Sequence, residues 1–372
     1  MSAAKDRGLI RPPGRNPHLF RPIELRSVTA KNRIMVSPMC QYSAEDGAPN
    51  DWHFQHLACR AVGGAGIVFT EVAHVEARGR ITPWCLGLWN DDQRDRLARI
   101  AAFIAAQNAV PAIQIGHAGR KAAAARPWEG GKPLALSDGG WPVIGPSAEP
   151  YADGWQTPEA MDQATIDEVI AAFAAATRRA REAGFRLAEI HAAHGYLLHE
   201  FLSPLSNRRN DAYGGDLAGR ARLLTEVIDA VRGEWPEELP LFLRLSASEW
   251  VEGGYALEDT IALVKLVAAR GDVDLIDCSS GGNHPEQEIP IFPGYQVQFA
   301  EAIKRETGMK TAAVGLIHAP EHAEEIIANG RADIVALART LLHEPYWPLH
   351  AAAKLKAADV AWPVQYERGN IF

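Results

Sequence analysis

The sequence predicts an α/β protein, a (βα)8 TIM barrel with an inserted excursion after the third strand. Three observations support this. Eight short apolar runs recur along the 372 residues, helical segments lie between them, and no glycine-rich dinucleotide loop follows the first run. Continuously apolar runs are typical of strands buried on both faces of a parallel sheet. Eight strand and helix units fit a barrel, whereas an open doubly wound sheet is expected to begin with GxGxxG.

The expected strands and helices alternate along the chain. The strands cover residues 33–40, 66–72, 110–118, 186–194, 241–248, 274–280, 310–315 and 332–339. The clearest helices between them are 91–109 and 165–184, and similar segments occupy 218–235, 257–271, 295–308 and 320–330. The helix over 165–184 is expected to begin at Thr165, with Glu168 completing a capping box, and to end at Gly184.

The interval from Arg120 to Thr165 contains no long helical pattern. It is rich in Gly, Pro and Trp and is too long for an ordinary connection, so we interpret it as an excursion over the barrel mouth. No domain boundary is visible elsewhere. We therefore expect a mobile N-terminal extension over residues 1–15 and a single barrel domain over residues 16–372 that ends in a C-terminal tail.

Composition argues against several classes of protein. The formal charge of −8 and a pI near 5.9 are unlike those of a nucleic-acid binder. No stretch approaches the ~20 apolar residues of a membrane span, and the N-terminus lacks the apolar core of a signal peptide. The four cysteines form no CxxC pair, which favours reduced thiols and a cytoplasmic location.

Polar side chains gather where the predicted strands end, which is where barrel active sites form. An arginine within the apolar run "LFLRLSA" requires a strongly polar partner. The glycine and arginine that end the last two strands are placed as in barrel phosphate sites. The residues in or at the ends of these strands are Met39, Cys40, Glu71, Gln114, His117, His191, His194, Arg244, Ser279, Ser280, Gly315 and Arg339.

Each of these residues, taken alone, also fits a structural role. Cys40 could be a small core residue. Arg244 could pair with a strand carboxylate such as Glu189. His191 and His194 could be hydrogen-bonded core histidines. Their joint occurrence at strand ends favours a functional site.

A metal site is the main rival interpretation. His191, His194 and Glu71 could be the ligands of a metal-dependent TIM-barrel hydrolase or lyase. The first strand, however, lacks the HxH pair usual in mononuclear barrel hydrolases, so we expect no metal. A Ser-His-Asp triad is disfavoured because the chain has no GxSxG elbow.

Beyond these residues, the chain resembles the Old Yellow Enzyme family, and within it the thermophilic-like bacterial branch that includes xenobiotic reductases. The resemblance extends from about residue 18 to the C-terminus. It is carried by "NRIMVSPMCQYS", "GRIT", "IQIGHAGRKA", "EIHAAHGYLLHEFLSPLSNRRNDAYGG", "RLSAS", "LIDCSSG", "FPGYQVQFA" and "PVQYERG". It implies an FMN-dependent ene-reductase that uses NADPH or NADH. A non-catalytic flavin-binding module remains a further alternative.

The resemblance also implies which residues bind FMN. Gln114 would bond the pyrimidine edge, and Arg244 would lie near N1 and C2=O, where reduced flavin carries negative charge. Cys40 would lie near N5 and O4 and tune the potential. The residues implied to line the ring are Ser37, Pro38, Met39, Cys40 and Val72, and those implied to hold the phosphate are Gly315, Ala338 and Arg339.

The implied reaction is the reduction of activated C=C bonds in small molecules such as enones, quinones and nitro compounds. His191 and His194 would donate hydrogen bonds to the carbonyl or nitro oxygen. The hydride would pass from flavin N5 to the β-carbon, and Tyr196 would protonate the α-carbon. Tyr42 would bind the substrate from the opposite side.

The C-terminal "PVQYERG" implies a homodimer, or a tetramer built from such dimers, in which Arg368 completes the neighbouring active site. Two positions depart from the family pattern. Val72 replaces a small residue beside the flavin, and Ala338 replaces a glycine before the phosphate arginine. A methyl group at Ala338 would crowd the phosphate if the backbone there were left-handed.

Overall fold

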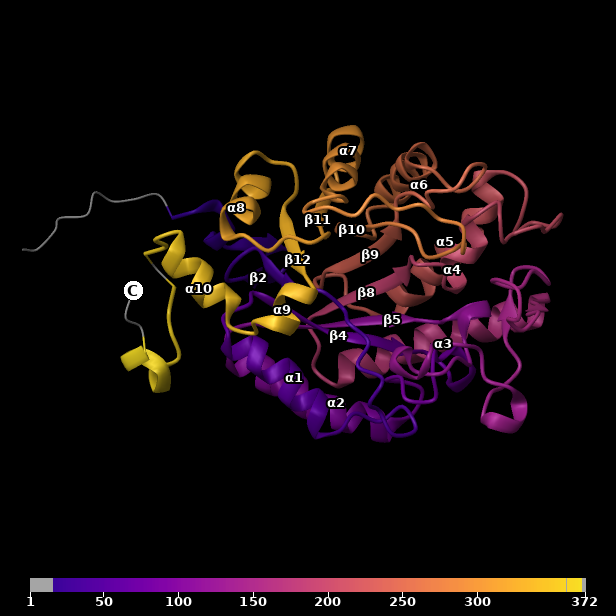
Figure 1. The fold of residues 1–372 in the computed structure, drawn as a ribbon, viewed down its shortest axis with the longest axis horizontal. Helices are drawn as coiled ribbons and strands as arrows, with labels where there is room; N and C mark the ends of the chain where they lie inside the picture. Colours follow the sequence, from indigo (N-terminus) through magenta and orange to yellow (C-terminus); the bar gives the residue numbers. More distant parts are fainter. Residues whose placement is uncertain (1–15, 359, 370–372) are drawn as a thin grey trace, which may run out of the picture.

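Eight parallel strands close into a barrel in the computed structural model, which describes residues 16–358 and 360–369. Every one of the eight predicted strands is present, and the predicted (βα)8 fold is confirmed (Figure 1). The strands, in their order around the barrel, are β10 (Leu275–Ser279), β11 (Lys310–Ala313), β12 (Ile334–Leu337), β3 (Ile34–Val36), β4 (Ile67–His74), β5 (Val110–Gly116), β8 (Leu187–Ala192) and β9 (Leu241–Ser246).

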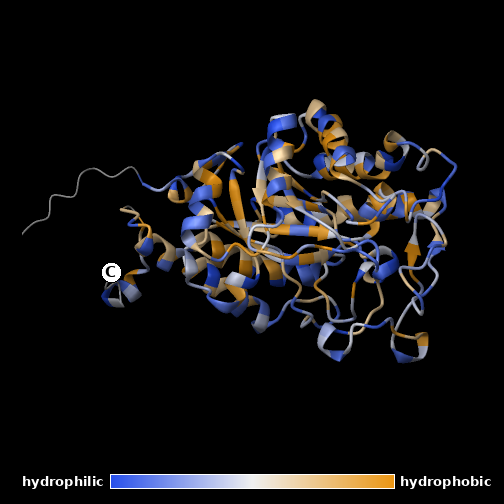
Figure 2. Cartoon of the chain, turned by 45° about the horizontal axis from the view of Figure 1, so that its top comes forward, coloured by the Kyte–Doolittle hydropathy of each residue, from blue (hydrophilic) through white to orange (hydrophobic). Residues whose placement is uncertain are grey.

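Helices surround the barrel and bury it. The long ones are α1 (Asp51–Val62), α2 (Asp91–Ala106), α3 (Gln163–Glu182), α5 (Leu217–Glu234), α6 (Leu257–Arg270), α7 (Val297–Thr307) and α8 (Pro320–Ala328). Short helices follow as α4 (Leu197–Leu202), α9 (Arg339–His343) and α10 (Trp347–Lys354). Figure 2 shows hydrophobic residues along the central strands, whereas the surrounding helices carry both hydrophilic and hydrophobic residues. None of the helices in the described ranges is long and apolar enough to cross a membrane.

One end of the barrel is closed by a hairpin that the sequence did not predict. It consists of β1 (Ile23–Leu25) and β2 (Val28–Ala30), which pair antiparallel. The Ser27 N–H donates to Glu238 O at 3.1 Å, and Arg26 pairs with Asp274 at 2.6 Å. Both partners directly precede barrel strands, so the hairpin covers the N-terminal ends of the strands. The opposite end is the mouth.

The predicted excursion follows β5. Between Lys121 and Asp162 the chain forms only 3-10 turns and the two-residue strands β6 (Ile144–Gly145) and β7 (Glu159–Ala160), which pair in parallel. The buried Arg120 ties it down by donating to Glu149 O at 3.2 Å and to Asn283 O at 2.8 Å. The excursion is thereby held over the loop that follows β10, on the mouth side.

The expected start of α3 was wrong. The helix is capped by Asp162, whose Oδ1 accepts from the Thr165 backbone N–H at 2.8 Å and from the Thr165 hydroxyl at 2.7 Å. Glu168, the expected partner in a capping box, instead pairs with Arg78 at 3.1 Å. The helix therefore begins one turn early because an aspartate is available there. It ends at Glu182, shortly before the left-handed Gly184, as expected.

Replacing Asp162 by Ala should lower the midpoint of thermal unfolding by about 1–3 °C, because the first turn of α3 loses its cap. Glu168→Ala is the control and should change the midpoint by less than about 1 °C, since its ion pair is exposed to solvent. Circular dichroism measures both. Equal losses in the two variants would contradict the assigned cap.

Candidate active site

Two histidines and a tyrosine converge at the end of β8. His191 is the second-last residue of the strand, and the chain then turns through His194 with φ +61° and Gly195 with φ +68°. A side chain at Gly195 would come within 2.3 Å of Gly282 O, so only glycine fits this turn. The ring centroids lie 5.1 Å apart for His191 and His194, and 5.2 Å apart for His191 and Tyr196.

The neighbouring strands hold this turn in place. The His194 backbone N–H donates to Ser246 Oγ at 2.9 Å, and its ring Nε2 lies 2.6 Å from Ser279 Oγ. The Lys121 ammonium donates to His194 O and to Gly282 O, both at 2.8 Å, and lies 4.8 Å from the Tyr196 ring centroid. These contacts from β9, β10 and the loop after β5 leave the turn little freedom.

Burial fixes the charge state of the three side chains. It lowers the pKa of His191 and of His194 well below the ordinary value, and the nearby Arg244 guanidinium lowers both further. Each imidazole is therefore neutral and carries one N–H. Burial also raises the pKa of Tyr196 well above its ordinary value, with Cys40 and Cys85 adding to the effect. Tyr196 thus keeps its proton.

The loop after β3 forms the facing wall. It presents Cys40 and Tyr42, which pack with Tyr196 against one small apolar cluster at the mouth. The Cys40 thiol and burial raise the pKa of Tyr42, and Tyr196 contributes to the same shift. The Tyr42 ring meets Trp128 of the excursion edge-on, with centroids 5.8 Å apart. The two tyrosines therefore belong to one site.

Arg244 of β9 is level with His191 in the strand register and lies among buried polar groups. Its Nε is 3.2 Å from Asp277 Oδ2, so its nearest carboxylate is Asp277 and not Glu189. Glu189 instead accepts a hydrogen bond from Gln114 Nε2 at 2.8 Å. All four side chains are buried.

The ends of β11 and β12 border a cavity of about 160 Å3, which is lined by Gly315, Ala338 and Arg339. Gly315 has φ +129°, and an added Cβ would lie 3.2 Å from the backbone nitrogen of Gln296. Ala338 has φ −108°, so its backbone is not left-handed and the crowding expected at this position does not arise. The polar residues at this cavity that were not predicted as site residues include Tyr295, Gln296, His318 and Thr340.

One side chain connects this cavity with the interior arginine. Both Arg339 and Arg244 oppose the effect of burial on the pKa of Tyr295. Tyr295 is therefore within electrostatic reach of both guanidinium groups. Ser279 also lines the cavity, and its Oγ lies 2.6 Å from His194 Nε2, so the cavity borders the turn that follows β8.

The remaining residues expected to line the ring lie between β3 and β5. Ser37 is buried, and its backbone N–H donates to Leu337 O at 3.0 Å. Pro38 and Met39 follow it and are half-buried. Val72 lies beyond a β-bulge in β4 and belongs to the apolar cluster at the mouth.

The rival metal site does not form. Glu71 pairs with His53 of α1 at 3.2 Å and accepts from the Gln41 N–H at 3.2 Å. Both of its carboxylate oxygens are therefore engaged, one by His53 and one by the Gln41 N–H. Within residues 16–358 and 360–369, no group of three or more His, Cys, Asp or Glu side chains could hold a metal ion.

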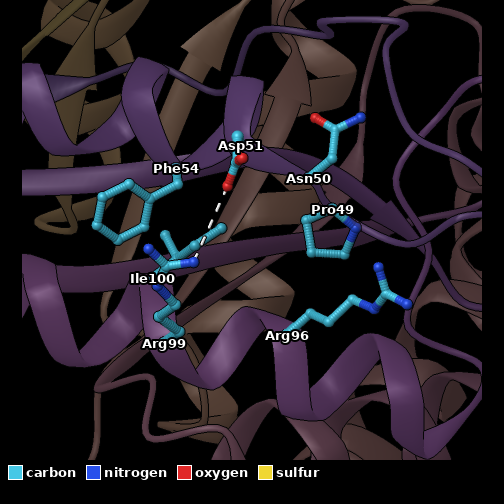
Figure 3. A pocket seen from close by; sticks show the side chains of 7 residues that line it. All are labelled: Pro49, Asn50, Asp51, Phe54, Arg96, Arg99 and Ile100. Atoms are coloured by element: carbon cyan, nitrogen blue, oxygen red, sulfur yellow. Dashed lines mark ion pairs between the residues drawn. The ribbon is translucent and has the colours of Figure 1, made fainter.

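A second pocket, of about 290 Å3, lies between α1 and α2 (Figure 3). Arg99 there lies 3.9 Å from Asp51 and 4.4 Å from the Phe54 ring centroid. The pocket is lined by Pro49, Asn50, Asp51, Phe54, Arg96, Arg99 and Ile100. None of these was predicted as a site residue.

Arg368 does not join the mouth of its own chain. It is exposed on η6 (Val364–Gly369), which Figure 1 shows beyond α10 and apart from the excursion. Tyr366 of η6 packs against Tyr346, which precedes α10, with ring centroids 6.0 Å apart.

The polar groups of the site fit FMN. Ser37 Oγ and His191 Nδ1 are buried without a hydrogen-bond partner in the described chain. Arg339 offers a positive charge at the phosphate-sized cavity, and Gly315 leaves room there. Buried donors without partners are costly, so a ligand that satisfies them is expected.

Known proteins support the same cofactor. The family model described as NADH:flavin oxidoreductase / NADH oxidase matches residues 18–358. An NADPH dehydrogenase from Geobacillus sp. (strain WCH70) is 48% identical over 353 residues, which cover 94% of this chain and 98% of that protein. An NADPH dehydrogenase from Bacillus subtilis (strain 168) is 43% identical over 353 residues, with the same two coverages.

A solved structure agrees with the fold. Morphinone reductase in complex with tetrahydroNAD superposes with a TM-score of 0.74 at 25% identity, covering 92% of each chain. The barrel, the mouth and these relatives lead to one assignment. The chain belongs to the NADH:flavin oxidoreductase / NADH oxidase family, the FMN-dependent oxidoreductases that include Old Yellow Enzyme.

Proposed function

We propose that the protein reduces activated C=C bonds of enones, quinones and nitro compounds, with NADPH as reductant and NADH as the alternative. One observation carries the proposal. Two neutral histidines and a protonated tyrosine converge at the end of β8. The His191 ring centroid lies 5.1 Å from that of His194 and 5.2 Å from that of Tyr196. The choice of NADPH follows from the relatives named NADPH dehydrogenase. The free thiols fit a cytoplasmic location.

The histidine pair polarises the substrate. As neutral imidazoles, His191 and His194 each donate an N–H to the carbonyl or nitro oxygen, where negative charge develops during reduction. FMN bound in the site would supply the hydride chemistry between the nicotinamide and the alkene. Losing one donor of this kind costs about 3 kcal/mol in comparable sites.

Tyr196 delivers the proton to the α-carbon. Its raised pKa keeps it protonated at neutral pH, and it lies beside the oxygen-binding pair. Tyr42 binds the substrate from the facing wall. Trp128 of the excursion packs edge-on against Tyr42. This contact limits the access of water to the mouth.

The cofactor is held by residues from all sides of the barrel. Gln114 would bond the pyrimidine edge, and Arg244 would offer its charge to the N1 and C2=O edge. Cys40 would lie near N5, where it would tune the potential. The remaining residues are Ser37, Pro38, Met39 and Val72 beside the ring, and Gly315, Ala338 and Arg339 at the phosphate.

The active unit is a homodimer or a tetramer of such dimers. Arg368 is exposed on a segment apart from its own mouth. On a symmetric partner the same segment reaches the facing mouth, and the guanidinium then closes it.

Tyr196→Phe should still bind FMN and be bleached by NADPH at the wild-type rate. Its reoxidation by 2-cyclohexenone should slow by about 10²-fold, because the general acid is missing. Stopped-flow absorbance separates the two half-reactions. Tyr151→Phe is the matched control, because the Tyr151 ring centroid also lies 4.9 Å from Lys121 Nζ, and it should leave both rates unchanged. Unaltered enone turnover in Tyr196→Phe would assign the proton to another donor.

Arg368→Ala should retain FMN yet lose at least about tenfold in kcat/KM for enones, because the partner's mouth stays open to water. Glu367→Ala, one residue away and equally exposed, is the control and should behave as wild type. Mixing Arg368→Ala with Tyr196→Phe gives the sharper result. Mixed dimers contain one site with both Tyr196 and an intact partner tail, so activity should partly return. No recovery after demonstrated subunit exchange, or a monomer by light scattering, would exclude the shared site.

A further inference from the structure

Beneath the mouth lies a layer of three ionisable side chains, Glu189, Arg244 and Asp277, which we call the buried charge layer. The strand register defines it. His191 of β8 pairs with Arg244 of β9, and Arg244 pairs with Asp277 of β10. Neighbours at one register level of a parallel sheet point to the same face. Arg244 and Asp277 therefore face the barrel interior at the level of the oxygen-binding His191, and Glu189 lies one interior position below.

The contacts within the layer are incomplete. Asp277 Oδ2 is 3.2 Å from Arg244 Nε, but among the described residues neither Asp277 oxygen has a hydrogen-bond donor of good geometry. Glu189 Oε1 accepts from Gln114, whereas its Oε2 has no partner in the described chain. Both carboxyl groups are fully buried. Asp277 is thus the only carboxyl group of the layer in direct contact with the guanidinium.

Two carboxylates cannot both be ionised beside one guanidinium at this depth without a large cost. Burial raises the pKa of Glu189 well above its ordinary value, and Asp277 raises it further. Burial also raises the pKa of Asp277, and the Arg244 charge opposes the shift in both groups. Of the two carboxyl groups, Asp277 is the one in direct contact with the guanidinium, at 3.2 Å. The negative charge therefore resides on Asp277, and Glu189 is a neutral acid.

We infer that Asp277 is a positioning residue that sets the reduction potential of the bound FMN, by holding Arg244 and cancelling part of its charge, while neutral Glu189 orients Gln114. The inference rests on the proposed place of Arg244 beside the flavin. Reduction places negative charge at the N1 edge, which an uncompensated guanidinium would favour strongly. The ionised Asp277 behind it keeps the potential lower, so reduced cofactor is a stronger hydride donor to the alkene.

The direct experiment measures the FMN potential of Asp277→Asn by equilibration with a reference dye. The ratio of reduced to oxidised cofactor at a fixed dye potential should rise at least about tenfold, a positive shift of about 30 mV for two electrons. Glu189→Gln replaces a neutral acid by a neutral amide and should stay within about threefold of wild type.

Asp274→Asn is the matched control, because Asp274 lies at the start of the same strand and pairs with Arg26 and Arg232 at the other end of the barrel. It should leave the potential unchanged. Asp277→Leu, of similar volume, replaces the asparagine variant if that variant does not fold. The expected sign of the shift is the same.

An unchanged or more negative potential in Asp277→Asn would overturn the inference, as would an equal shift in Glu189→Gln. Loss of FMN from both Asp277 variants would also overturn it, since the residue would then be structural. Arg244→Met distinguishes an error in the proposed place of Arg244 from an error in the role inferred for Asp277. An unchanged potential in Arg244→Met would refute the proposed place of Arg244. A shift in Arg244→Met without one in Asp277→Asn would refute the charge balance alone.

Discussion

The register of β8 against β9 is the constraint on which the active site depends. His191 lies level with Arg244, and Arg244 lies level with Asp277 of β10. Because side chains alternate along a strand, a slip of one residue would turn His191 and Glu189 out of the barrel together. The turn at His194 and Gly195 depends on the same alignment, since it is held by Ser246 and Ser279 at the ends of β9 and β10.

Burial then determines the chemistry that this geometry supports. At the mouth it favours the uncharged forms of His191, His194, Tyr196 and Cys40. Neutral imidazoles and an unionised phenol can donate hydrogen bonds to a substrate oxygen without adding charge to the mouth. Positive charge comes from the arginines in the interior and at the phosphate-sized cavity. Such a site is suited to receiving negative charge on substrate and cofactor.

Much of this arrangement could be predicted from the sequence. The barrel strands are continuous apolar runs, and the helices after β4 have clear periodicity. The missed elements are those with weak local signals. The strands β1 and β2 have three residues each, and α1 begins at an Asn50–His53 capping box, an unusual pair. Lys121 and Asp277 both lie within motifs that carry the family resemblance, but neither was predicted as a site residue. Only the strand register reveals that Asp277 faces Arg244.

The central claim is that the histidine pair binds an oxyanion at the mouth. Titration of the FMN-bound protein with para-substituted phenols tests it most directly, because a phenolate carries its charge on one oxygen. The dissociation constants should fall as the phenol becomes more acidic, and His191→Ala and His194→Ala should each weaken binding about tenfold or more while FMN content stays normal. Affinity independent of phenol acidity and unaltered in both variants would contradict the account.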